Sequence, residues 1–272
     1  MTEPLKLFCV FAHPDDETFG TGSTLAKYSR EGVEVHLMVA TRGERGWPVA
    51  THPGLAEVAR VRTEELKNAA AILGIRQVTY LNYLDGDLDK ANQTEVLGQI
   101  VRELRRVRPQ VVITFDPFGN YGHPDHIAIA QFTQAALVLA ADASYQDPAH
   151  LPAHRVSKLY YLVDSQPLLD LYTQLFGAIT FPVDGVIRQG IGWPDWAITT
   201  WIDGDAYWEM TWWAMACHTS QLGDITQIGT AVREHHQLLA GLRTYYRAYS
   251  LVNCGREPES DLFAGLRPVA DE

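Results

Sequence analysis

Two short segments of the chain concentrate histidine and aspartate: "AHPDDE" at residues 12–17 and "YGHPDH" at residues 121–126. Each follows an apolar run, "LKLFCVF" in the first case and "QVVITF" in the second. Burying so many ionisable groups without partners is costly, and a divalent cation removes that cost. Imidazole and carboxylate together suit zinc, which in catalytic sites binds three protein ligands and leaves a fourth position for water. His13, Asp16 and His126 would form such an open site.

A purely structural interpretation of each segment is also available. Pro14 and Pro124 suit the first turn of a helix, where a following aspartate is favoured by the helix dipole and a histidine can cap the N-terminus. For either segment alone, this interpretation and the metal site are about equally good. Two such segments at matching positions in the strand–helix pattern favour the metal site. Glu17 fits a supporting role in its helical turn better than a catalytic one.

The elements that must position these segments alternate between strand-like and helix-like patterns through the first half of the chain. Strands are expected at residues 6–12, 33–40, 77–81, 110–115 and 158–163. The helical segments between them stop near Gly32, Gly74 and Pro109, residue types that commonly end helices. This order predicts a Rossmann-like, three-layer α/β/α fold with a mostly parallel sheet, and we expect residues 1–272 to form a single domain.

The same order predicts where the two acidic segments lie. In a doubly wound sheet the first and fourth strands commonly lie side by side where the strand order reverses, and ligands bind outside their carboxyl ends. We therefore expect both segments to meet in one pocket. After about residue 165 the pattern is looser, with a late strand at 196–203 and a helix from roughly 205 to 217. Residues 140–195 carry no pattern that defines the substrate.

The composition of the chain limits the kinds of molecule that it can bind. The formal net charge of −11 argues against binding to nucleic acid or to an anionic membrane surface. Cys9, Cys217 and Cys254 are far apart and form no C-x-x-C pair, so neither a disulfide framework nor a cysteine zinc site is indicated. The N-terminus lacks a basic leader, and no apolar run reaches the roughly 18 residues of a spanning helix. We expect a cytoplasmic protein without a membrane span.

Six of the seven tryptophans fall between residues 193 and 213. Clustered tryptophans more often belong to a core or a subunit interface than to a platform on which a sugar ring stacks. A homo-oligomer with a contact in this region is therefore one possibility, and the sequence does not decide the oligomeric state.

Together with "TRGERG" at 41–46, "VRTEELKNAAAILGI" at 61–75 and "HTSQ" at 218–221, the two acidic segments resemble the LmbE-like superfamily of zinc-dependent deacetylases. This superfamily is also named after N-acetylglucosaminyl-phosphatidylinositol de-N-acetylase (PIG-L). The resemblance is close over about residues 5–140 and thinner over 196–221. It implies the LmbE-like fold and Zn²⁺ as cofactor, held by the three residues already favoured by their types.

The resemblance also implies roles for other residues. Asp15 would act as general base, His123 would stabilise the oxyanion or protonate the leaving amine, and Asp125 would orient His123. Three further residues would contact the substrate: Arg62, Tyr121 and His218. The implied reaction removes an N-acetyl group from a small N-acetylglucosamine-type sugar or glycoconjugate.

Other functions are compared with this one. A second enzymatic possibility keeps the metal but hydrolyses the amide of a thiol conjugate or another amide conjugate. A catalytically inactive, metal-binding regulatory module is less consistent with the presence of Asp15, His123 and Asp125, which binding alone does not require. A nucleotide-binding Rossmann domain would carry G-x-G-x-x-G after its first strand. The residues there are "AHPDDETFGTG", so the phosphate-binding loop is missing.

Overall fold

The computed structural model describes residues 4–267 except 48–50, 179, 184, 253, 254 and 256. All five strands expected in the first half of the chain are present, with ends that differ by no more than about one residue. The strands of the described chain are β1 (Lys6–Phe11), β2 (Glu34–Val39), β3 (Gln77–Tyr80), β4 (Val111–Phe115), β5 (Lys158–Val163), β6 (Thr180–Val183), β7 (Val186–Gln189), β8 (Thr200–Asp203) and β9 (Leu242–Ser250).

Helices follow most of the strands, and the expected stops are confirmed. Gly74 adopts the left-handed conformation (φ 74°) directly after the second helix, and Gly32 (φ 85°) lies two residues beyond the first. The late strand is shorter than expected, because Asp195–Ala197 form a 3-10 turn before it. The helices are α1 (Asp16–Arg30), α2 (Leu55–Leu73), α3 (Gln93–Val107), α4 (Gly119–Gly122), α5 (Pro124–Ala141), α6 (Gln166–Phe176), α7 (Trp208–Cys217) and α8 (Ile225–Glu234).

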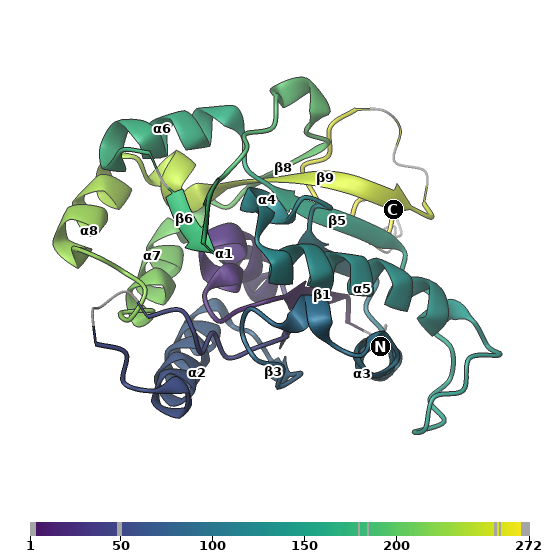
Figure 1. Ribbon diagram of the computed structural model, residues 1–272. Coiled ribbons are helices and arrows are strands. Elements are labelled where there is room, and N and C mark those ends of the chain that lie inside the picture. The colour runs from purple at the N-terminus through teal and green to yellow at the C-terminus, as the bar shows by residue number, and fades with distance from the viewer. Residues whose placement is uncertain are drawn as a thin grey trace.

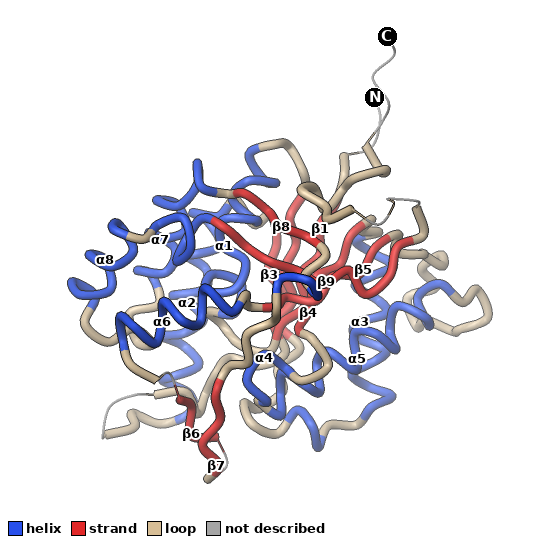
Figure 2. Tube along the Cα trace, turned by 90° about the horizontal axis from the view of Figure 1, so that it is seen from above, coloured by secondary structure: helices blue, strands red, loops and turns tan. Residues whose placement is uncertain are grey.

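The central sheet has the strand order β3-β2-β1-β4-β5-β9-β8. Strands β1 to β5 pair in parallel, and β9 runs antiparallel to both of its neighbours. Helices α3 and α5 cover one face of the sheet, and α1, α2 and α7 cover the other (Figures 1 and 2). The three-layer α/β/α fold with a mostly parallel sheet is thus confirmed. The sequence did not indicate the antiparallel strand β9.

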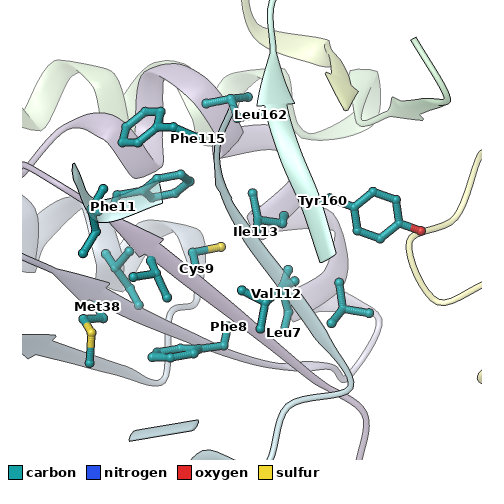
Figure 3. Close-up of a cluster of buried hydrophobic side chains, with 14 of the residues drawn as sticks. Leu7, Phe8, Cys9, Phe11, Met38, Val112, Ile113, Phe115, Tyr160 and Leu162 are labelled. Carbon is teal, nitrogen blue, oxygen red and sulfur yellow. The ribbon is translucent and has the colours of Figure 1, made fainter. Parts of the chain in front are cut away.

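The hydrophobic core lies along the central strands. Because helices cover both faces, β1 and β4 are apolar almost without interruption, and their side chains are nearly all buried. Figure 3 shows Phe11 and Phe115 together near the ends of these strands, with ring centroids 5.1 Å apart. Burying a ring of this size stabilises the fold by about 1.5–3 kcal/mol. The two rings also fix the sheet edge from which the acidic segments begin.

Two parts of the later chain were not predicted. Strands β6 and β7 form a separate antiparallel hairpin that extends away from the central sheet (Figure 2). Helices α6 and α8 share a second apolar cluster, in which Leu168 contacts the same group of side chains as Val232 and Leu239. In the described part of the chain, no helix is both long and apolar enough to cross a bilayer.

The tryptophans of residues 193–213 are dispersed over several elements instead of forming one cluster. Trp196 is 87% exposed and Trp213 is 54% exposed, whereas the ring nitrogen of Trp193 donates a hydrogen bond to Asp116. Of the two positions expected for these tryptophans, core or subunit interface, the core is therefore excluded for Trp196 and Trp213. Their exposure leaves an interface between copies of the chain as a prediction.

Candidate metal and catalytic site

The two acidic segments meet because the strands before them are neighbours. β1 pairs directly with β4, so the turn before α1 and the start of α5 lie at the same edge of the sheet. His13 follows β1 and His126 lies in the first turn of α5, yet their ring nitrogens Nδ1 and Nε2 are only 3.2 Å apart. The prediction that both segments share one site is confirmed.

Donor atoms of three residues converge there. His126 Nε2 lies 3.5 Å from Asp16 Oδ1, and His13 Nδ1 lies 3.7 Å from Asp16 Oδ2. The two ring nitrogens are 3.2 Å apart, and the two Asp16 distances belong to different oxygens of its carboxylate. Ligand atoms bound tetrahedrally to zinc at about 2.0–2.2 Å lie roughly 3.3–3.5 Å from one another. The 3.2 Å and 3.5 Å spacings are close to this range, so the three residues are a candidate site for a small divalent cation.

Backbone groups orient the Asp16 carboxylate. Its Oδ2 accepts hydrogen bonds from the backbone N–H groups of Ala12 (3.2 Å) and His13 (2.7 Å), while Oδ1 is directed toward His126. Burial raises the pKa of Asp16 to about 7, although His13 nearby opposes that change. A buried carboxyl group of this kind loses its proton most readily when a cation binds.

His13 is oriented by two carboxylates behind it. Its Nε2 lies 3.1 Å from Asp85 Oδ1 and 3.2 Å from Asp125 Oδ2. Burial alone would lower the pKa of His13, but these carboxylates and Asp16 raise it well above its ordinary value. A hydrogen on Nε2 shared with carboxylates leaves the lone pair of Nδ1 directed at His126 and Asp16, the arrangement typical of a metal-binding histidine.

Asp85 was not identified from the sequence. It follows β3 in the segment "LDGD" at residues 84–87, and its Oδ2 accepts the backbone N–H of Arg45 at 3.0 Å. The available signal was its position: an acidic residue after a third parallel strand, at the edge of the sheet where the first two segments lie.

The structure changes the expected role of Asp125. Its carboxylate is fully buried and accepts the backbone N–H groups of Gly86 (2.7 Å) and Leu88 (3.1 Å), in addition to facing His13. The hydrogen bond between Asp125 and His123 is made by the Asp125 backbone N–H, which donates to Nδ1 at 3.1 Å. The carboxylate thus supports His13, where a supporting role toward His123 was expected.

The hydrophobic core fixes the orientation of the His126 ring. Its ring stacks on Phe115 with a centroid distance of 3.9 Å and an interplanar angle of 7°. Burial, followed by the nearby His13 and His123, lowers the pKa of His126 well below its ordinary value. The neutral imidazole is the form that binds a metal.

His123 belongs to the same cluster but offers different chemistry. The ligand atoms of His13, His123 and His126 lie within 4.8 Å of one another, so distance alone also permits His123 as a metal ligand. However, Nδ1 of His123 accepts the Asp125 N–H, and the hydrogen of the neutral ring must then be on Nε2. A nitrogen that carries a hydrogen donates it and does not coordinate a metal. Asp16 therefore remains the predicted third ligand.

Asp15 occupies a constrained turn beside the metal ligands. Its φ of 110° is rare for a residue other than glycine. A guanidinium nitrogen of Arg62 donates to Pro14 O (2.6 Å) and to Asp15 Oδ2 (3.0 Å). Burial raises the pKa of Asp15, although the Arg62 charge opposes this effect. Asp15 lines the large cavity described below, so its carboxylate is both positioned and accessible.

Arg62 was expected to contact substrate, and the structure corrects this role. Only 3% of the residue is exposed, and its other terminal nitrogen donates to Gly43 O at 2.9 Å. A Cβ atom at Gly43 or Gly46 would lie 2.1 or 2.3 Å from this guanidinium. The glycines of "TRGERG" therefore make room for Arg62. Its observed position makes it a support for the Asp15 turn.

His218 was also expected at the substrate, and it is instead fully buried. Its Nε2 lies 2.9 Å from Glu17 Oε1, and Glu17 Oε2 accepts the backbone N–H of Asp15 at 2.9 Å. Burial alone would raise the pKa of Glu17, but His218 lowers it. This buried pair supports the Asp15 turn from within the protein. The supporting role predicted for Glu17 agrees with these contacts.

The rest of "HTSQ" attaches the end of α7 to neighbouring elements. Glu65 of α2 accepts hydrogen bonds from the Thr219 hydroxyl, the Ser220 N–H and the Ser220 hydroxyl. Gln221 donates to Gly46 O at 2.9 Å and lines the cavity. The segment therefore closes the site from the side of α7.

A cavity of about 660 Å³ opens in front of Asp15, Asp16 and His126. This volume lies within the range of roughly 300–1,000 Å³ typical of small-molecule sites. Tyr121 lines it, stacked on Phe181 at 4.2 Å and edge-on to His126 at 5.0 Å, so its expected position near substrate agrees with the geometry.

The two arginines of "TRGERG", Arg42 and Arg45, do not line the cavity. Arg42 bonds to Thr63 and Asn82, and Arg45 bonds to Asp87. The described tryptophans do not line it either, so a tryptophan platform for a sugar ring finds no support in the cavity wall.

The fold and the site define a class: an α/β protein with a candidate metal centre where two parallel strands end beside a cavity. Residues 8–137 match the family described as PIG-L, GlcNAc-PI de-N-acetylase. A 1D-myo-inositol 2-acetamido-2-deoxy-alpha-D-glucopyranoside deacetylase from Kineococcus radiotolerans is 32% identical over 98% of this chain and 85% of its own length. A mycothiol S-conjugate amidase from Streptomyces coelicolor is 30% identical over 99% and 100%.

Among solved structures, the N,N'-diacetylchitobiose deacetylase from Pyrococcus horikoshii shares the fold with a TM-score of 0.66 and 22% identity. The alignment covers 89% of this chain and 83% of that one. The chain belongs to the PIG-L (LmbE-like) family.

Proposed function

We propose that this protein is a zinc-dependent hydrolase that removes the acetyl group from an N-acetylglucosamine-type sugar or glycoconjugate. The observation that carries the proposal is the convergence of His13 Nδ1, His126 Nε2 and the Asp16 carboxylate, beside a cavity that Asp15 also lines. The sugar substrate is supported by the relatives, whose names include an acetamido-sugar deacetylase. Zinc is favoured by two imidazoles and one carboxylate as donors.

His13, Asp16 and His126 would hold the ion, and Asp85 and Asp125 would keep the His13 ring in its binding orientation. When bound, zinc supplies a Lewis acid that polarises the amide carbonyl and makes nearby water more acidic. Five carboxylates belong to the cluster, and the guanidinium in direct contact with them is that of Arg62. This excess of negative charge suits a divalent cation. The carboxylates are those of Asp15, Asp16, Glu17, Asp85 and Asp125.

Asp15 is proposed as general base. It takes a proton from the water that attacks the amide carbon, a role that requires an ionised carboxylate facing the cavity. Arg62 favours that ionised form and fixes the turn through Pro14 O. The buried Glu17–His218 pair holds the backbone N–H of Asp15 from the other side. The base is thus positioned from two directions, which lowers the cost of reaching the reactive geometry.

His123 is proposed as the donor that completes the reaction. Because its Nδ1 accepts a backbone N–H, its Nε2–H is directed away from the start of α5. A donor there can stabilise the negative oxygen of the tetrahedral intermediate or deliver a proton to the departing nitrogen. The reaction of water with the amide thus yields acetate and a free amine. Tyr121 would contact the substrate from the cavity wall.

The test couples metal analysis to acetate release for the full chain loaded with zinc. Asp15→Asn should keep its metal and lose about 10²- to 10⁴-fold in turnover, because a general base typically contributes that much. His126→Ala should lose the metal. Asp89→Asn and His52→Ala, at exposed positions, are matched controls that should behave like the wild type. A fully active Asp15→Asn enzyme would refute the assignment of the base, and a wild-type protein that binds no divalent ion would refute the whole proposal.

A second candidate keeps the same site and changes the amide. The mycothiol S-conjugate amidase relative aligns over nearly the whole chain, and the cavity is much larger than an acetamide requires. Turnover of a bulky thiol-conjugate amide, compared with acetate release from N-acetylglucosamine compounds, separates the two candidates. A metal-binding protein without turnover would release neither product.

A further inference from the structure

The large cavity has two chemically different ends. The metal ligands and Asp15 lie at one end, at the carboxyl edge of the central sheet. The opposite wall comes from α6, from the hairpin strand β6 and from α8, which lie on the same side of the sheet in Figure 1. Most of its side chains are aromatic or aliphatic, namely Leu169, Tyr172, Phe176, Phe181 and Ile228, and its polar members are Thr173, Asp224 and Gln227. The part of a substrate away from its acetamide therefore meets mainly apolar groups.

This apolar wall is a packed surface. Phe181 stacks on Tyr121, which connects the hairpin to the reactive end of the cavity. The rings of Tyr172 and Phe176 lie 6.2 Å apart on α6. Behind them, α6 and α8 share the second apolar cluster, which includes Leu168 and Val232. A pre-formed apolar wall binds apolar groups without first having to be ordered.

The charges of the cavity lining all have one sign. Four carboxylates occur among the lining residues, those of Asp15, Asp16, Asp164 and Asp224, and the described lining includes no lysine or arginine. Arg62 lies beneath Asp15 and is engaged by it. Asp224 caps α8 by accepting the N–H groups of Thr226 and Gln227. Away from the proposed metal site, a phosphate on the substrate would meet no lysine or arginine of the described lining, and the carboxylates of Asp164 and Asp224 would disfavour it.

We propose that the site selects an N-acetylated amino sugar whose remaining part is uncharged and apolar, such as an alkyl or aryl aglycone that packs against α6 and α8. The inference rests on the proposed hydrolysis of an acetamide at Asp15 and the metal. It sets the specificity of this chain apart from the phosphate-bearing substrate in the name of its family. Leu169, Tyr172 and Phe176 are the residues that determine the preference.

The first experiment compares three substrates with the full chain loaded with zinc: methyl and octyl 2-acetamido-2-deoxy-β-glucopyranoside, and N-acetylglucosamine 1-phosphate. The octyl glycoside should exceed the methyl glycoside in kcat/KM by about tenfold or more, since burial of roughly two additional methylene groups is enough for that. The phosphate should fall below the methyl glycoside. Equal values for methyl and octyl, or a preference for the phosphate, would overturn the inference.

Binding separates this inference from the proposed reaction. Calorimetry with Asp15→Asn measures the affinity for the same three compounds without turnover. If no acetate is released from any of them but octyl still binds more tightly than methyl, the reaction fails and the apolar subsite stands. If acetate is released without a difference between methyl and octyl, the subsite fails and the reaction stands. If none of the compounds binds, both are refuted.

A matched pair of variants locates the subsite. Leu169→Ser should raise KM for the octyl glycoside about fivefold and leave KM for the methyl glycoside within about twofold. Leu251→Ser makes the same change at a position that is 55% exposed and follows β9, away from the cavity lining, and it should alter neither value. A Leu169→Ser effect of equal size on both substrates would show a general disturbance of the site and would contradict the subsite.

Discussion

Two buried clusters of charge lie at opposite ends of strands in the same sheet. At the start of β5, Glu259 accepts Lys158 Nζ at 2.7 Å and the Tyr160 hydroxyl at 2.6 Å, and it pairs with Arg247 at 2.9 Å. Figure 3 shows the Tyr160 ring extending out of the apolar cluster toward the C-terminal chain. One carboxylate is thus enclosed by two cations and a hydroxyl.

The cluster at the carboxyl end of β1 and β4 has the opposite balance. Several carboxylates surround His13, and the donor atoms of His126 and Asp16 face it across a gap of 3.2 to 3.7 Å. The Glu259 carboxylate is paired with two cationic side chains, whereas several carboxylates share His13 in the other cluster, which is a candidate site for a cation. The difference indicates that the first cluster fastens the C-terminal segment and that the second serves chemistry.

The largest expected effect is a loss of stability when the cluster at Glu259 is disrupted. Glu259→Ala leaves the fully buried Lys158 without its partner, so the free energy of unfolding should fall by about 3–5 kcal/mol. Metal content and turnover per folded molecule should not change, because the cluster lies away from the cavity lining. Denaturant unfolding monitored by fluorescence, together with metal analysis, measures both quantities.

Glu257→Ala is the control for this variant, since Glu257 is exposed two residues away and should cost little. A Glu259→Ala protein with normal stability but lost metal would reverse the assignment of roles to the two clusters.

A smaller effect is expected at Arg62, which supports the Asp15 turn beside the His13 cluster. Arg62→Lys cannot reach Gly43 O, Pro14 O and Asp15 Oδ2 at once, because an ammonium lacks the planar fork of a guanidinium. Turnover should fall about tenfold, from poorer positioning of Asp15, while zinc content stays at the wild-type level. Steady-state kinetics and metal analysis decide the outcome.

Arg60→Lys, on the exposed side of the same helix, serves as the comparison and should keep full turnover. Loss of zinc in Arg62→Lys would mean that Arg62 supports the metal ligands themselves and not the base alone.

The smallest effect concerns a carboxylate near the surface. Burial would raise the pKa of Asp261, but Arg267, the Phe263 N–H and the Tyr28 hydroxyl lower it below its ordinary value. A carboxylate with a lowered pKa in the folded state adds stability above its unfolded pKa of about 4, and that stability is lost as the pH falls. Asp261→Asn should therefore cost about 1 kcal/mol at pH 7, with a difference from wild type that narrows below about pH 4.

Unfolding curves at several pH values measure this difference, and Asp89→Asn at an exposed position should show no such dependence. A difference that stays constant down to pH 3 would mean that the Asp261 contacts do not depend on its charge.

The sequence predicted the first half of the fold well because β1, β2, β4 and β5 are almost wholly buried, and because a glycine or proline lies within two residues of the ends of α1, α2 and α3. It also predicted that His13 and His126 lie close together, because neighbouring parallel strands end at the same edge of a sheet. The later half was harder. Helix α6 and the hairpin lack the continuous apolar runs of the central strands, and their side chains are partly exposed at the cavity.

The errors at the site share one cause. Arg62 and His218 were expected at the substrate, but each lies beneath the Asp15 turn and bonds to groups from distant parts of the chain. The Asp125 carboxylate contacts His13, and it is the backbone N–H of Asp125 that bonds His123. Residue type showed that these side chains belong near the chemistry. It did not show which of them face the cavity.

By itself, the sequence determined the strand–helix order, the two acidic turns and the residue types able to bind a metal, because these follow from local patterns of burial and charge. Only the tertiary structure decided the partner of each polar group and the apolar wall opposite the metal. A hydrogen bond or a cavity depends on distances of a few ångströms between residues that can be more than 100 positions apart, as His13 and His126 are. Such distances exist only after the sheet and its helices have packed.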